Sequence, residues 1–89
     1  MLNDNESVAL FRQYGKRLYN TALRITLSPD ESDEIMQETL IRFITGPMTG
    51  VSDASKVWAW LRTTCVRLSI DWLRSRKRFV SLDDVDDEP

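Results

Sequence analysis

The chain has 89 residues, which suits one small domain with a single hydrophobic core and leaves no room for a second. It contains no histidine and one cysteine, Cys65, so the commonest general base, the usual zinc-ligand sets and an internal disulfide are all absent. We therefore expect no enzymatic activity, no metal and no cofactor. The net charge of −2 would argue against nucleic acid, but the charges are segregated along the chain.

The composition predicts an all-α fold. Gly and Pro number three each, and no run of alternating β-branched residues suggests a strand. The sequence has no stretch of about 18 consecutive apolar residues, so it predicts no membrane span. The polar beginning of the chain also lacks the features of a signal peptide. We therefore expect a cytoplasmic domain without membrane insertion.

The first predicted helix runs from about Asn5 to Thr26. Its apolar side chains recur at helical spacing and predict a core-facing stripe, flanked by Tyr14 and Tyr19. The stripe consists of Val8, Phe11, Leu18, Ala22 and Ile25. The cations are predicted to face outward, and these are Arg12, Lys16, Arg17 and Arg24.

A second helix is predicted to begin near Pro29. Ser28 can cap it, proline suits its first position, and Glu31 would complete a capping box. Its predicted core residues are Ile35, Met36, Leu40, Phe43 and Ile44. The helix should stop at Gly46 and Pro47, and a loop is expected over residues 48–52.

The third predicted helix is the longest, capped by Ser52 or Asp53 and fraying near Lys77 or Arg78. Its core stripe is predicted to consist of Val57, Leu61, Cys65, Leu68 and Trp72, with Cys65 as a buried structural thiol. Val66, Ile70 and Leu73 lie on another face, so this helix should be covered from two sides as the central helix of a compact three-helix bundle. We expect the domain to span residues 1–78 and the acidic residues 79–89 to form a disordered linker or tail.

A basic stripe follows the third helix. At about 100° per residue, Trp60 falls among the cations rather than on the core stripe, whereas Trp58 and Trp72 are expected in the core. A ring beside a row of cations suits single-stranded nucleic acid, because bases stack and phosphates are neutralised. The simpler alternative is a solvated face on which Asp71 bridges Arg67 and Arg74. The predicted DNA-binding residues are Lys56, Trp60, Thr64, Arg67, Arg74, Arg76, Lys77 and Arg78.

An acidic patch is predicted on the second helix. Acidic residues near a helix start are favoured by the dipole alone, so an ordinary solvated face is the alternative. An exposed apolar residue beside the patch instead favours a protein partner with basic residues. The patch consists of Asp33, Glu34, Gln37, Glu38 and Ile41.

Two segments resemble the region 2 signatures of bacterial extracytoplasmic-function sigma factors. Ser32-Asp-Glu-Ile-Met-Gln-Glu-Thr-Leu40 resembles the family's Ala-Glu-Asp-Leu-Val-Gln-Glu-Val-Phe. Trp60-Leu-Arg and Ile70-Asp-Trp-Leu-Arg74 resemble the two ends of its Trp-Leu-x-x-Ile-Ala-x-Asn-x-x-Ile-Asp-x-Leu-Arg motif. The resemblance extends from about Val8 to Arg78. Arg67 replaces the family's Asn.

The resemblance implies a three-helix domain that binds the clamp helices of the RNA polymerase β′ subunit. It also implies melting of the minus-ten promoter element with capture of the non-template strand, and an anti-sigma factor as a further partner. Glu34, Gln37 and Glu38 match the polymerase-binding motif, whereas Trp60, Arg67, Arg74 and the loop after Gly46 lie where the family meets promoter DNA. A protein-interaction module that sequesters another transcription regulator is the alternative function.

Overall fold

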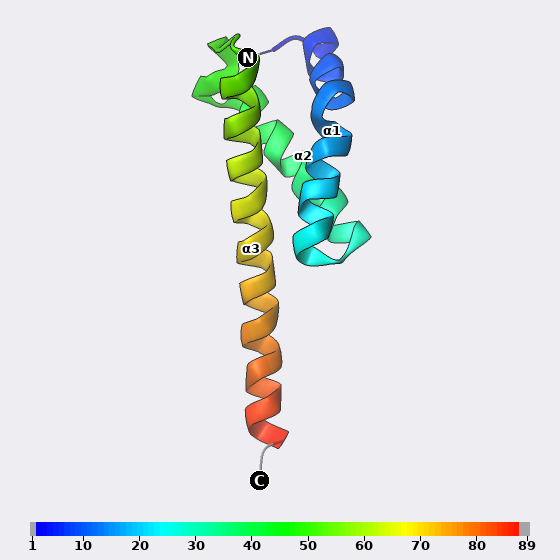
Figure 1. Ribbon diagram of the computed structural model, residues 1–89, viewed down its shortest axis with the longest axis vertical. Coiled ribbons are helices and arrows are strands. Elements are labelled where there is room, and N and C mark those ends of the chain that lie inside the picture. Colours follow the sequence, from blue (N-terminus) through cyan, green and yellow to red (C-terminus); the bar gives the residue numbers. More distant parts are fainter. Residues whose placement is uncertain (1, 88–89) are drawn as a thin grey trace.

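The computed structural model describes the backbone of residues 2–87 and the side chains of residues 2–76. The described chain forms three α-helices and one short 3-10 helix, with no strand, so the predicted all-α bundle is confirmed. The elements are α1 (Asp4–Thr26), α2 (Pro29–Thr45), η1 (Pro47–Gly50) and α3 (Ala54–Asp87). Helices α1 and α3 run in the same direction, and α2 returns in the opposite direction (Figure 1). Each helix contacts the other two.

Side-chain caps set the helix starts. Asn3 Oδ1 accepts a hydrogen bond from the Glu6 backbone N–H at 2.8 Å, and Glu6 Oε1 accepts one from the Asn3 N–H at 3.1 Å. This complete capping box on α1 was not predicted. Ser28 caps α2 as predicted, with its Oγ 3.3 Å from the Glu31 nitrogen. The predicted capping box with Glu31 is wrong, because the Ser28 N–H donates to the Thr26 hydroxyl instead.

Buried hydroxyl groups fix the turn between α1 and α2. The Thr26 and Ser32 hydroxyls lie 2.9 Å apart, and the Ser32 hydroxyl donates to the Ser28 carbonyl at 2.7 Å. Leu27 between them has a left-handed φ of 56° and is 81% exposed. Because this conformation costs an L-residue about 1–2 kcal/mol, the hydroxyl network holds Leu27 there against its local preference.

Glycine ends α2 at the predicted position. A Cβ atom at Gly46 would lie only 2.6 Å from the Arg42 carbonyl oxygen, so a larger residue would not fit. The following segment, predicted as a loop, contains the 3-10 helix η1. Asp53 then caps α3, because its Oδ1 accepts from the Ser55 N–H at 2.9 Å.

The core draws on all three α-helices. Its buried residues are Tyr14, Leu18, Ala22, Ile35, Leu40, Phe43, Val57, Leu61 and Cys65. The predicted stripe on α3 is confirmed, with Leu68 and Trp72 packed against the core at half burial. Val8 was predicted to be in the core but is 49% exposed, whereas its neighbours Leu10 and Phe11 are partly buried against the core. Tyr14 was expected on the flank and instead lies in the core.

Helix α3 packs on both other helices, as predicted. Its Trp58 stacks on Tyr14 of α1 at a centroid distance of 6.0 Å, and its Trp60 meets Phe43 of α2 edge-on at 5.7 Å. Figure 1 shows α3 continuing well beyond α1 and α2. It extends to Asp87, past the predicted end near residues 77–78, because no Gly or Pro interrupts residues 54–87. The division into a domain of residues 1–78 and a linker of residues 79–89 stays a prediction.

Candidate functional site

The predicted acidic patch forms one exposed surface on α2. Its four polar residues are exposed, and Ile41 beside them is 49% exposed. We call this surface the acidic face, and it comprises Asp33, Glu34, Gln37, Glu38 and Ile41. An exposed apolar side chain among carboxylates can supply both contact area and charge complementarity to a protein partner.

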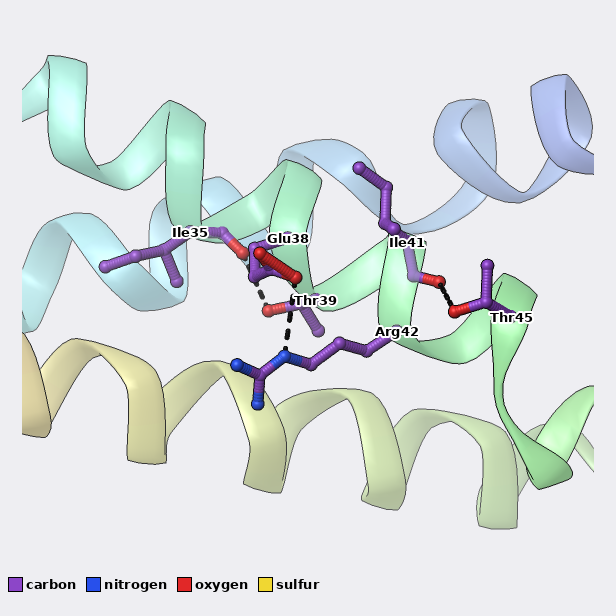
Figure 2. A network of polar contacts seen from close by, with 6 residues as sticks. All are labelled: Ile35, Glu38, Thr39, Ile41, Arg42 and Thr45. Atoms are coloured by element: carbon purple, nitrogen blue, oxygen red, sulfur yellow. Dashed lines mark hydrogen bonds and ion pairs between the residues drawn. The ribbon is translucent and has the colours of Figure 1, made fainter.

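Contacts one helical turn apart position the side chains of the acidic face. Gln37 Nε2 donates to Asp33 Oδ2 at 2.8 Å, and Arg42 Nε lies 3.4 Å from Glu38 Oε2. Figure 2 shows Arg42 reaching back along α2 to Glu38, whereas Ile41 points away from Arg42. Both members of the ion pair are about half exposed, so we expect it to contribute at most about 1 kcal/mol to stability. Its main effect is to orient the Glu38 carboxylate.

A groove of about 280 Å³ borders the acidic face on the side toward α3. It is lined by Glu31, Glu34, Ile35, Glu38 and Arg42 from α2 and by Leu68 from α3. Glu31, Arg42 and Leu68 were not among the predicted site residues. The spacing of Glu31, Glu34, Glu38 and Arg42 along one side of α2 was the available signal. The contribution of Leu68 depends on how α2 and α3 pack.

The predicted DNA-binding residues differ in how far their side chains are exposed. Four cations are exposed, namely Lys56, Arg67, Arg74 and Arg76, whereas Thr64 is half-buried. The side chains of Lys77 and Arg78 lie outside the described residues. Trp60 was expected to be exposed but is half-buried, because Phe43 of α2 packs against its ring. Only part of this indole is therefore available to a base.

Arg67 and Arg74 line a groove of about 410 Å³ along the outer side of α3. Arg62, Thr63, Val66, Ile70 and Asp71 complete its lining. Val66 and Ile70, expected on a covered face of α3, are half-buried and border this open groove. Among the described side chains, Asp71 forms no ion pair with Arg67 or Arg74. The bridged arrangement considered as an alternative for this stripe is therefore not formed.

The loop after Gly46 borders a further cavity of about 430 Å³. Its walls come from the beginning of α1, the η1 segment and the beginning of α3. The loop itself contributes no aromatic ring, and the rings at the cavity belong to the buried residues Tyr14 and Phe43. Thr49 and Ser52 add hydroxyl groups at its edge. The cavity therefore combines apolar walls with a few hydrogen-bonding groups.

The one cysteine is unsuited to nucleophilic chemistry. The Cys65 side chain is fully buried, and its Sγ donates to the Leu18 carbonyl at 3.4 Å, as expected of a structural thiol. Burial raises the pKa of this thiol, although hydrogen bonds with Ser69 and Thr39 oppose the shift. Within the described part of the chain, no three potential metal ligands gather and no helix is apolar enough over a membrane-spanning length.

Comparison with protein families finds a match for this chain. The family model for sigma-70 region 2 matches residues 10–79. The match includes every residue of the acidic face and every predicted DNA-binding residue. Comparisons with curated proteins and with solved structures find no match.

Proposed function

Because this chain belongs to the sigma-70 region 2 family, we propose that its acidic face docks on RNA polymerase while α3 captures melted promoter DNA. Region 2 of sigma factors serves promoter recognition and polymerase binding. We further propose an extracytoplasmic-function sigma factor, which binds the β′ clamp helices and opens the minus-ten element. The motifs Ser32–Leu40 and Trp60–Arg74 support that finer assignment by their resemblance to the family's signatures.

The separation of charge carries the proposal. The acidic face lies on α2, whereas the exposed cations Arg67, Arg74 and Arg76 lie on α3. A partner with basic residues and a polyanion can therefore bind at the same time on different surfaces. Such simultaneous binding is what a factor that brings polymerase to DNA requires.

Strand capture must offset the cost of unstacking bases, which is a few kcal/mol. Stacking on an aromatic ring contributes about 1–3 kcal/mol per base. The half-buried ring of Trp60 leaves part of its surface for a base, and the cavity beside the loop after Gly46 offers space for an unstacked base. Lys56, Arg67 and Arg74 would neutralise the phosphates.

Polymerase docking is tested by pull-down of the chain with an isolated β′ clamp-helix fragment. We expect Gln37→Ala and Glu34→Lys to lose binding, because both change the acidic face. Asp4→Lys is the matched control, since Asp4 is an exposed acid on α1 outside this face. Undiminished binding by both test variants, with circular dichroism showing intact helices, would contradict docking through the acidic face.

The DNA role is tested by charge reversal at Arg74 and Arg76. If α3 holds the promoter strand, Arg74→Glu with Arg76→Glu should abolish binding to a single-stranded minus-ten oligonucleotide and reduce transcription initiation. The alternative, a module that sequesters another transcription regulator, predicts that these changes leave function intact. Clamp-helix binding by the same variant shows whether the domain is still folded.

A further inference from the structure

Arginines from two helices line one groove between α1 and α3. The groove has a volume of about 330 Å³ and is lined by Thr21, Arg24 and Ile25 of α1 and by Trp58, Arg62 and Val66 of α3. No carboxylate is among these lining residues. The packing of α1 on α3 thus places two cations at the same groove with no compensating acid.

Neither arginine has an acidic partner among the described side chains. Arg24 Nε donates to the Asn20 carbonyl oxygen at 3.4 Å, which leaves its two terminal amino groups available. Arg62 is exposed and forms no ion pair within the described residues. Because like charges repel, two unpaired guanidinium groups at one groove favour the binding of an anion.

The lining of the groove strengthens that preference. Ile25 and Val66 contribute apolar surface, and a guanidinium–phosphate contact is stronger beside apolar groups than in bulk water. Trp58 lines the same groove, and Arg17 covers its ring at 3.8 Å from the centroid. A third guanidinium, that of Arg17, therefore contacts a residue that lines this groove.

The groove adjoins the one along α3. Arg62 and Val66 line both grooves, and Arg67 and Arg74 line the second. Twelve residues separate Arg62 from Arg74, which is about 18 Å along a helix axis. That length corresponds to roughly five phosphates of one DNA strand. The arginines thus form a row on the scale of a short backbone segment.

We propose that Arg24 and Arg62 form a phosphate clamp that binds the nucleic acid backbone, extending the contact made by Arg67 and Arg74. This inference rests on the proposed DNA role of α3. It adds a contact from α1, a helix that holds none of the predicted DNA-binding residues. The phosphates can belong to the melted strand or to the adjoining duplex, and the two sources are separable by experiment.

The test compares a clamp variant, Arg24→Gln with Arg62→Gln, against a control variant, Arg12→Gln with Lys16→Gln. Both variants lose two exposed cations, but Arg12 and Lys16 line neither groove. Fluorescence anisotropy measures binding of a single-stranded oligonucleotide and of a duplex across a salt series. Two lost phosphate contacts should make the log–log salt slope shallower by about 1.4 for the single strand or about 1.8 for the duplex.

The probe that shows this change identifies the source of the phosphates. Equal slopes for the clamp and control variants on both probes would overturn the clamp while leaving the DNA role of α3 intact. No binding of either probe by the unmodified chain at low salt would overturn the DNA role itself, and the clamp with it. The variant Arg24→Gln with Arg62→Gln should keep full binding to the helices of the RNA polymerase β′ subunit, because its changes lie outside the acidic face.

Discussion

The acidic face and the row of arginines carry opposite charges and differ in how those charges are held. On α2, side chains one helical turn apart bind one another, as in the contacts of Gln37 with Asp33 and of Arg42 with Glu38. The arginines along the two grooves come from α1 and α3 and have no acidic partner among the described side chains. The first surface is thus organised within one helix, whereas the second gains Arg24 only through the packing of α1 on α3.

A substitution in the core that both surfaces share should disturb both of them. Leu61 is fully buried where α3 meets the other helices, so Leu61→Ala should lower the free energy of unfolding by about 2–5 kcal/mol. Urea denaturation measures the loss. The arginine surface should be disturbed more than the acidic face, because the packing of α1 on α3 places Arg24 beside Arg62. Equal weakening of DNA and clamp-helix binding would contradict that difference.

An exposed apolar residue provides the control for this change. Ile41 is 49% exposed, so Ile41→Ala should change the free energy of unfolding by less than about 0.5 kcal/mol. It should still weaken clamp-helix binding, because Ile41 supplies the apolar part of the acidic face.

The next largest difference between the two surfaces should be the salt dependence of their binding. With about four to five phosphates engaged, the log–log slope for single-stranded DNA should be near −3, so a fourfold rise in salt should weaken binding by about 60-fold. Docking through the acidic face also uses apolar contact and should depend less on salt. Anisotropy with each probe across one salt series measures both slopes, and a flat DNA slope would exclude backbone binding.

Neutralising single acids should change binding affinity less, and each change should affect a different partner. Asp71 lines the groove with Arg67 and Arg74, so Asp71→Asn should tighten DNA binding by up to about fivefold. Asp33→Asn removes the same charge from the acidic face and should leave DNA affinity unchanged while weakening clamp-helix binding. Equilibrium titrations of both variants with both partners measure the pattern.

The smallest expected effect is a pH dependence of stability. Burial raises the pKa of Cys65, so the folded state keeps the thiol protonated at pH values where the unfolded state ionises. The contribution of the thiol to the free energy of unfolding is fully present below the pKa of the unfolded state, which is about 8.5. It is lost as pH rises through the pKa of the folded state. Thermal unfolding above about pH 8.5 should therefore show a steeper fall for the native chain than for Cys65→Ala.

Local signals explain what the sequence could predict of this fold. Ser28 at the start of α2, Gly46 at its end and Asp53 before α3 each act through atoms within a few residues. The core stripe on α3 follows from helical periodicity alone. The exposure of the acidic face was likewise predictable, because one helix supplies all of its residues.

The features that were missed depend on contacts between helices. The approach of Phe43 to Trp60, which covers part of the ring, has no signal in the spacing of either residue. The shared groove of Arg24 and Arg62 arises only when α1 lies along α3. Val8 fits the periodicity of α1 but is 49% exposed while the nearby Leu10 and Phe11 pack against the core, so its pattern predicted a burial that the tertiary structure does not supply.

The three tryptophans of α3 give the protein a built-in set of optical reporters. Trp58 lies beside Tyr14 and under the Arg17 guanidinium, Trp60 lies against Phe43, and Trp72 lies near Arg76 at 5.1 Å. Their emission should therefore respond to three separate events, namely the parting of α1 from α3, the parting of α2 from α3, and a change beside Arg76. Variants that keep one indole at a time could follow each event in real time as the domain meets its partners.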